Sequence, residues 1–468
     1  MADDRQPPAG ACDLLVENGL VITVDEERRM IERGAVAIAG GRIVAGGPTE
    51  EGRAAFAAER VIDAAGKVVT PGLMNAHLHT TQGLYRGYVP DDVSDTYEYI
   101  FGWVVPYYVA LTPEEERLAV ALSCADSLRQ GVTNVAEAGT MRHPLSSAEA
   151  IAESGIRGFV GRWIWDLEQD PPQLRMTERA ALDAVEEVLD AFRGGVRDRV
   201  RAFASVIGMA TCSEAVLTGT KVLADRYGAV MQIHQSLDAE EVARYQRHAG
   251  FTGDPMTRFA QLGLLGPDLR MIHMLDLDAE GVELVAQSGA SIVRCLGAYA
   301  GRGVAEMRAQ GIPVAFGTDT VNLSNSCDML RAIHHSVALA REWPEQFGSL
   351  TVEAALEMLT LDGARSVGAA EVLGSLSVDK EADLVIFDAG RPEWVPQLDP
   401  VGNLMFSADG GSAETVIVGG DVLVEGGRLT RVDEAALYAE AQEAAERIVA
   451  RLGIERPRRW PLIEGSRA

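Results

Sequence analysis

Short runs of strand-forming residues alternate with longer amphipathic segments through the middle of the chain. The runs lie at 131–135, 155–160, 200–204, 229–233, 269–272, 291–295 and 313–316. Runs of this length between turn residues are typical of buried strands, whereas the segments between them have the spacing of helices. Together with a first strand at 68–79 they make eight alternating units, which predicts an α/β fold with a (β/α)8 TIM barrel over residues 68–371.

One helix of this region has a recognisable beginning. Thr112 is a favourable N-cap, Pro113 suits the first helical position, and the acidic residues 114–116 follow on the first turn. Apolar side chains then recur at helical spacing, at Ala119, Leu122, Ala125 and Leu128. The pattern predicts a helix that starts at Pro113.

Both ends of the chain carry a different pattern, in which short strands are separated by turn residues. Near the N-terminus Asn18-Gly19, a strong hairpin signal, interrupts one apolar run, and Gly40-Gly41 interrupts the next. The same arrangement returns around Gly419-Gly420. We therefore expect residues 1–67 and 372–468 to build one composite β-sandwich domain with a C-terminal helix, and the barrel to be inserted into it.

Composition restricts the partners and the location. Asp and Glu number 69 against 42 Lys and Arg, which gives a net charge of -27 without any concentrated basic stretch. Nucleic acids and anionic membrane surfaces need positive charge, so neither is an expected partner. The five cysteines form no CxxC pair, and the acidic, proline-containing start has no apolar leader. We expect a cytoplasmic protein with reduced thiols that acts on a small molecule.

Four of the eight histidines follow predicted strands. His77 and His79 end the first strand, and residues two apart on a strand point to the same side. His234 follows the fifth strand, His273 the sixth, and Asp319 the eighth. Each alone is more often an ordinary core or surface residue. Because the chemistry of such a barrel lies at the C-terminal ends of its strands, the five side chains are expected at one mouth.

These residues resemble the amidohydrolase superfamily and, within it, the ATZ/TRZ branch of triazine hydrolases and cytosine-deaminase-like enzymes. The similarity runs over nearly the whole chain and rests on Pro71-Gly72-Leu73 before His77-Leu78-His79, the histidines after strands five and six, Gly317-Thr318-Asp319, and the closing segments 373–376 and 382–385. The resemblance implies a barrel with a flanking β-sandwich, one divalent metal, and hydrolysis at a carbon bound to nitrogen. Similar enzymes are often homo-oligomers.

The donor set suits a catalytic metal site. His77, His79, His234 and Asp319 are ligands for Zn²⁺, the favoured ion, or for Fe²⁺ or Co²⁺, and they leave room for a water. A metal lowers the pKa of such a water to about 7. Asp319 is expected to take the water's proton and pass it to the leaving nitrogen, whereas His273 either orients the water, polarises an oxygen, or binds the metal.

Strand four bears on the number of metals. Members of the superfamily with two metals bridge them with a carboxylated lysine at the end of this strand, and residues 205–212 contain no lysine. Cys212, and Glu137 after strand two, are donors in principle, although a buried thiol and a hydrogen-bonded carboxylate are the more ordinary roles. We expect one metal.

The run after His234 departs from the family pattern. Deaminases and chlorohydrolases of the branch usually carry, three residues later, a Glu that protonates a ring nitrogen, and this chain has Leu237 there. Leu275 also stands where deaminases often have a further His. We therefore expect hydrolysis of a C–N bond in a small urea, carbamate, thiocarbamate or amide, as in phenylurea hydrolases or molinate hydrolase. The alternatives are deamination of an aminated heterocycle (cytosine, guanine, adenosine-type or triazine) and a non-catalytic barrel scaffold.

Several residues near predicted strand ends are candidates for contact with a substrate. They are Tyr85, Arg86, Trp103, Trp163, Trp165 and Leu237. The aromatic residues suit a pocket for an apolar or aromatic substrate, although core packing explains each of them equally well. Arg86 either orients a polar group of the substrate or pairs with a surface acid.

Overall fold

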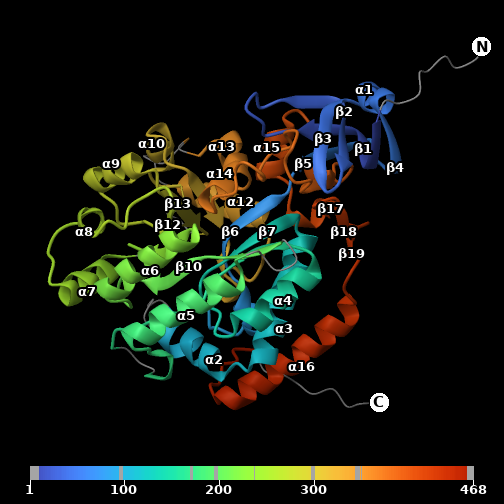
Figure 1. The fold of residues 1–468 in the computed structure, drawn as a ribbon. Helices are drawn as coiled ribbons and strands as arrows, with labels where there is room; N and C mark the ends of the chain where they lie inside the picture. Colours follow the sequence, from blue (N-terminus) through green and yellow to red (C-terminus); the bar gives the residue numbers. More distant parts are fainter. Residues whose placement is uncertain are drawn as a thin grey trace, which may run out of the picture.

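Strands of the chain form one mixed sheet and two parallel sheets in the computed structural model. The structure describes residues 10–93, 98–168, 172–193, 199–236, 238–296, 301–342, 348 and 350–460. Figure 1 shows the strands from the two chain ends gathered on one side of the molecule, with helices α6 to α10 on the opposite side. The predicted α/β class with parallel sheets is confirmed.

The nine-stranded sheet joins both ends of the chain, in the order β19-β18-β17-β16-β5-β1-β2-β3, with β4 paired to β1. Its strands are β1 Gly10–Ile22, β2 Met30–Ala39, β3 Arg42–Pro48, β4 Phe56–Asp63, β5 Lys67–Pro71, β16 Leu384–Asp388, β17 Ala413–Val418, β18 Asp421–Glu425 and β19 Arg428–Leu429. The antiparallel pairing of β5 with β16 joins segments more than 300 residues apart, with Leu384 opposite Pro71. A separate sandwich domain with the expected boundaries stays a prediction.

Two of the three expected turns are present, and one is not. Both Gly40-Gly41 and Gly419-Gly420 connect antiparallel strands, and all four glycines have positive φ. The prediction of a hairpin at Asn18-Gly19 is wrong, because β1 continues through these two residues as one strand with a register shift against β2. Asn18 takes the left-handed conformation at φ 64°, which creates a bulge instead of a turn. Beyond the bulge the strand gains a new partner in β5, so the backbone stays paired.

The two parallel sheets contain the strands that the apolar runs predicted. Their orders are β15-β6-β7-β8-β9 and β10-β11-β12-β13-β14. The strands are β6 Leu73–His79, β7 Val132–Glu137, β8 Arg157–Val160, β9 Val200–Ala202, β10 Ala204–Gly208, β11 Met231–Gln235, β12 Leu269–His273, β13 Ser291–Cys295, β14 Val314–Gly317 and β15 Asp319–Thr320. Only Phe203 separates β9 from β10, and only Thr318 separates β14 from β15. The strands thus follow the predicted order as two sheets, and the closed barrel stays a prediction.

Helices follow the parallel strands. They include α2 Val105–Ala110, α3 Pro113–Arg129, α4 Pro144–Ser154, α5 Glu178–Ala191, α6 Glu214–Tyr227, α7 Ala239–Ala249, α8 Pro255–Gln261, α9 Ala279–Ser288, α10 Val304–Ala309, α11 Val321–Ser324, α12 Met329–Ala340, α13 Val352–Met358 and α14 Leu361–Ser366. The start of α3 is as predicted, because Thr112 and Glu115 form a capping box. None of the described helices is long and apolar enough to cross a membrane.

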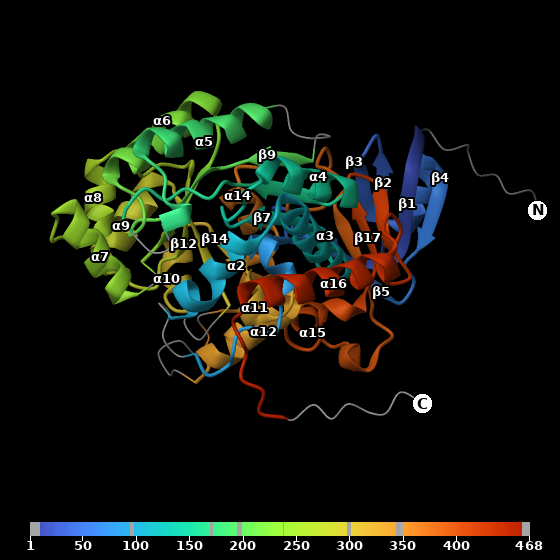
Figure 2. The ribbon, with the colours of Figure 1, turned by 90° about the horizontal axis from the view of Figure 1, so that it is seen from below.

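Three further α-helices lie among the described residues. In chain order, α1 Thr49–Ala55 follows β3, α15 Pro400–Phe406 lies between β16 and β17, and α16 Glu434–Leu452 follows β19. Figure 2 shows α16 lying along the molecule beside α3. Its buried residues include Ala444 and Ile448. At its end the Arg451 guanidinium donates two hydrogen bonds to the Glu115 carboxylate, at 2.7 and 2.9 Å. The C-terminal helix is thereby attached to the first turn of α3.

Candidate metal centre

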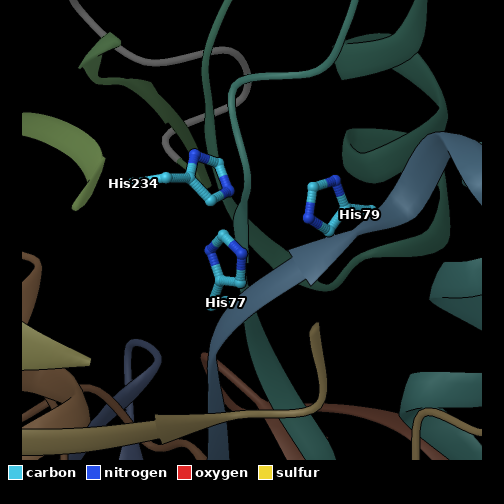
Figure 3. Close-up of side chains that lie close together, drawn as sticks. All are labelled: His77, His79 and His234. Carbon is cyan, nitrogen blue, oxygen red and sulfur yellow. The ribbon is translucent and has the colours of Figure 1, made fainter. Parts of the chain in front are cut away.

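Three imidazoles meet at the ends of β6 and β11. His77 and His79 project from the same side of β6, and His234 approaches from β11, so that the three rings face a common space (Figure 3). Their ring centroids are 4.9 Å apart for His77 and His234, and 5.1 Å apart for His77 and His79. One nitrogen of each ring lies within 4.8 Å of the others. This spacing suits ligands of one metal ion.

Asp319 and His273 complete the group. The pairing of β15 with β6 brings the Asp319 carboxylate to 3.1 Å from Nε2 of His79 and 3.5 Å from Nε2 of His77. The His273 ring, at the end of β12, is 5.6 Å from that of His234. All five residues predicted at the strand ends therefore lie together.

The ring nitrogens of the histidines are available to coordinate a metal cation. Both ring nitrogens of His77 are buried and make no hydrogen bond with the part of the chain that the structure describes. Nδ1 of His234 lies 2.5 Å from the Ile207 carbonyl oxygen, to which it donates, so Nε2 keeps a lone pair. Unpartnered buried nitrogens are costly in a protein interior, and coordination to a metal satisfies them.

Burial keeps His77, His234 and His273 neutral. It lowers the pKa of His77 and of His234 to about 3, and that of His273 to about 4. Neutral imidazole is the form that binds a metal. Burial by itself would raise the pKa of Asp319, but contacts with His77 and His79 hold it well below its usual range. The centre thus offers neutral nitrogens and an ionised carboxylate, which is the donor set of a Zn²⁺ site.

The backbone beside the site is strained. Four residues here have a positive backbone φ, which residues other than glycine rarely adopt. The values are 50° for Ser236, 74° for His273, 52° for Met274 and 64° for Asp319. Each such residue costs about 1–3 kcal/mol and persists only where the surrounding structure imposes it. All four lie at or just beyond the ends of β11, β12 and β14, where the chain turns the donor atoms toward one another.

Other acids and thiols near the site have different surroundings. Cys212 is buried and its thiol donates to the Ile164 carbonyl oxygen at 3.4 Å. The Glu137 carboxylate accepts hydrogen bonds from Gly139 and Thr140. Cys295, at the end of β13, lies with His273 and Asp319 in a second group whose donor atoms are within 4.8 Å of one another. This thiol was not among the predicted site residues, although the strand-end rule that selected the histidines also selects it.

The expected substrate residues lie in varied surroundings. Tyr85 is buried and stacks on Tyr107 with centroids 4.5 Å apart. Trp103 is partly buried against Tyr88. The Arg86 guanidinium pairs with the Asp126 carboxylate at 2.7 Å, which is the ion pair considered as its alternative role. Leu237 lies outside the described residues.

Trp163 is connected to the histidines through Tyr108. Its ring packs on Trp165 and on Tyr108, with centroids 5.6 and 5.2 Å apart. The Tyr108 hydroxyl in turn lies 3.4 Å from Nδ1 of His79. Tyr108 sits in a short apolar helix, and no sequence signal marked it as part of the site.

Comparisons with a family model and with curated proteins identify relatives of this chain. The model of the amidohydrolase family matches residues 68–423. A 5-methylthioadenosine/S-adenosylhomocysteine deaminase from Syntrophobacter fumaroxidans is 31% identical over 435 residues, covering 90% of this chain and 95% of the relative. A 5'-deoxyadenosine deaminase from Methanosarcina mazei is 28% identical over 450 residues, covering 94% and 99%. These relatives are deaminases, not the phenylurea or molinate hydrolases favoured from the sequence.

Solved structures agree on the fold. An adenosine deaminase from Xanthomonas campestris with bound zinc is similar at a TM-score of 0.87 and 27% identity, over 95% of this chain and 100% of that one. An atrazine chlorohydrolase from Arthrobacter aurescens complexed with zinc shares the fold at a TM-score of 0.81 and 21% identity, over 92% and 100%. With the family model matched over most of its length, and with histidines and an aspartate clustered at its strand ends, the chain belongs to the amidohydrolase family.

Proposed function

We propose that the protein is a metal-dependent deaminase of an adenosine-type compound, which replaces the exocyclic amino group by oxygen from water and releases ammonia. The observation that carries the proposal is the cluster of histidines and Asp319 in a chain that is 31% identical, over 90% of its length, to a deaminase of this kind. From the sequence alone deamination ranked second, and the relatives reverse that order. The non-catalytic scaffold is not kept, because the family consists of enzymes and the donor set is complete.

The side chains have separate tasks in this proposal. His77, His79, His234 and Asp319 would hold one divalent metal, with Zn²⁺ favoured. A metal there supplies the Lewis acidity that lowers the pKa of a water to about 7. Asp319, ionised at neutral pH, accepts the proton of the attacking water and returns it to the leaving nitrogen. His273, neutral and on the neighbouring strand, hydrogen-bonds the water or the substrate.

The test is ammonia release by the zinc-loaded protein. Adenosine, 5'-deoxyadenosine, 5-methylthioadenosine and S-adenosylhomocysteine are supplied in turn, and ammonia is measured in a coupled assay beside the loss of the aminopurine absorbance. Activity on at least one compound, abolished by a chelator and restored by Zn²⁺, is the expected result. Absence of ammonia from all four would refute the proposal.

A second function, hydrolysis of a urea, carbamate or amide, is supported by the absence of a glutamate at position 237. Position 237 is Leu, and the next residue, Asp238, caps α7 by accepting a hydrogen bond from the Glu241 backbone N–H at 2.8 Å. A urea, carbamate or amide needs no proton on a ring nitrogen. Amine release from a phenylurea or thiocarbamate, without ammonia from the adenosine series, would favour this second function.

The variant Leu237→Glu separates the two. It restores a carboxylic acid where related deaminases carry one, so we expect faster ammonia release and unchanged or slower urea cleavage. Leu275→Glu serves as the control, since it adds an acid after a different strand. Four expectations from the sequence stay predictions beside this proposal. They are the division of the chain into 1–67 with 372–468 and 68–371, the closed barrel, the homo-oligomeric state and the cytoplasmic location.

A further inference from the structure

A cavity lies where the nine-stranded sheet meets the parallel strands β8 and β9. It encloses about 390 Å³, within the range of about 300–1,000 Å³ that is typical of sites for small molecules. The turn between β2 and β3 and the turn between β17 and β18 line it from one side, and the beginnings of β8 and β9 line it from the other. The metal donors lie at the C-terminal ends of their strands, so this cavity is separate from the metal centre.

Arginines dominate the charged lining of this cavity. Among the described residues that line it, four are arginines and Glu381 is the only acid. The arginines are Arg42, Arg157, Arg199 and Arg201. This concentration of positive charge stands out in a chain whose net charge is -27. A cleft lined by one sign of charge attracts ligands of the opposite sign, so the cavity favours an anion.

Two of the four guanidinium groups are fixed by the surrounding protein. Arg157 donates from Nε to Oδ2 of Asp383 and from Nη2 to Oε2 of Glu381, both at 2.7 Å. Arg199 donates from Nη2 to the Val418 carbonyl oxygen at 3.1 Å. Because these groups are already ordered, a ligand that binds them does not have to immobilise two flexible side chains.

The two fixed guanidinium groups lie side by side at Gly419. A Cβ built on this glycine would be 3.1 Å from Nη2 of Arg157 and 3.3 Å from Nη2 of Arg199. Gly419 has a φ of 55° and no side chain, so the turn leaves room for both groups. Like charges this close repel each other, and an anion in contact with both relieves that repulsion.

The carboxylates at the cavity do not balance its arginines. Five guanidinium groups in and beside it face three carboxylates, an excess of two positive charges. Two carboxylates are each shared by two arginines, namely Glu381 by Arg42 and Arg157, and Asp421 by Arg199 and Arg431. The third, Asp383, pairs with Arg157. The fifth arginine, Arg201, is exposed and forms no ion pair with the part of the chain that the structure describes. A doubly charged anion matches this excess.

Apolar side chains complete the lining. They are Phe159, Ala369, Val372 and Leu373. The ring of Phe159 stacks on that of Phe203, with centroids 5.3 Å apart, which fixes its position. The cavity therefore offers contacts both to an anionic group and to an apolar body attached to it.

We propose that this cavity is a binding site for the phosphate group of a small molecule. Guanidinium forks match phosphate oxygens in both geometry and charge. Arg42 belongs to the nine-stranded sheet and Arg201 to a parallel sheet, so a phosphate that contacts both links the two sheets and stabilises the folded protein. The site contains none of the metal donors, and it is independent of the proposed function.

The test is calorimetric titration of the full-length, zinc-loaded protein with pyrophosphate, inorganic phosphate and AMP at constant ionic strength. Arg201→Gln removes the guanidinium that has no acid partner, and we expect the Kd for pyrophosphate to rise about 10-fold or more. Arg42→Gln removes the other exposed guanidinium and is expected to have the same effect, so it decides the outcome if Arg201→Gln does not fold. Tighter binding of AMP than of inorganic phosphate would identify an organic phosphate as the ligand, and the reverse would identify free phosphate.

The matched control is Arg428→Gln. Arg428 is also exposed on a strand and forms no ion pair with the described residues, but it lies outside the cavity. We expect this variant to keep the wild-type Kd. Pyrophosphate should also raise the urea midpoint of the wild type and of Arg428→Gln, and should raise that of Arg201→Gln much less.

A zinc ion also attracts phosphate, so the titration is repeated after the metal has been removed with a chelator. Binding that depends on Arg201 is expected to persist without zinc. The proposal is overturned if none of the three compounds binds, if Arg201→Gln and Arg42→Gln both bind as tightly as the wild type, or if binding is lost with the metal. Failure of ammonia release with intact phosphate binding would refute the proposed function alone.

Discussion

The contact between β14 and β6 offers a sharp test of how the fold builds the site. Gly317 ends β14 directly beside His77, and a Cβ added to it would lie 2.5 Å from the His77 carbonyl oxygen and 2.6 Å from its backbone nitrogen. Ordinary contact requires about 3.4 Å or more. The substitution Gly317→Ala therefore forces the two strands apart by roughly 0.9 Å, because backbone atoms cannot move aside as a flexible side chain can.

That displacement has two measurable results. Overpacking of this kind costs about 1–3 kcal/mol of unfolding free energy, which urea unfolding of the metal-free protein measures. Asp319 follows Gly317 by two residues, so its carboxylate moves relative to His77 and His79. A misplacement of about 1 Å near reacting groups can lower activity by about 100-fold, and Zn²⁺ affinity is expected to fall with it.

The control is Gly46→Ala, in which the new Cβ would meet its closest neighbour at 3.8 Å. We expect this variant to match the wild type in stability, Zn²⁺ affinity and turnover. The reasoning is refuted if Gly317→Ala has the wild-type urea midpoint and turnover, or if Gly46→Ala is affected as strongly.

Three further outcomes are expected. His234→Ala leaves too few donors, so the purified protein should contain far less than one equivalent of zinc by elemental analysis, and a full equivalent would contradict the ligand assignment. Arg451→Met should lower the unfolding free energy at pH 7 by about 0.5–1 kcal/mol. Hydrogen bonds from Arg451 lower the pKa of Glu115, so the ion pair stabilises the fold above the ordinary glutamate pKa, and this stabilisation is lost as the pH falls through the lowered pKa. A loss of unfolding free energy in Arg451→Met that persists in acid would argue against the ion pair. Arg86→Ala should change kcat/KM by less than about threefold, because Asp126 already engages this guanidinium, and a much larger loss would return Arg86 to the substrate site.

The candidate metal donors are predictable from the spacing of residues along the strands. Strand periodicity places His77 and His79 on one side of β6, and the parallel arrangement of the following strands carries His234, His273 and Asp319 to the same end. Each step depends only on local pattern and on the order of elements. This is why the predicted strands and the five residues at their ends match the observed ones, whereas the choice of substrate class did not follow from one missing glutamate.

The order of strands and helices, and the donor atoms at the strand ends, are local properties of the chain, because both arise from spacing between nearby residues. Packing between distant segments is not encoded in that spacing. It makes Asn18 a bulge instead of a hairpin, since β5 supplies a new partner for β1. It also brings Tyr108 to Nδ1 of His79, a contact between residues of a helix and a strand that depends on packing alone. Contacts between distant segments thus orient His79 through the Tyr108 hydroxyl and His234 through the Ile207 carbonyl oxygen.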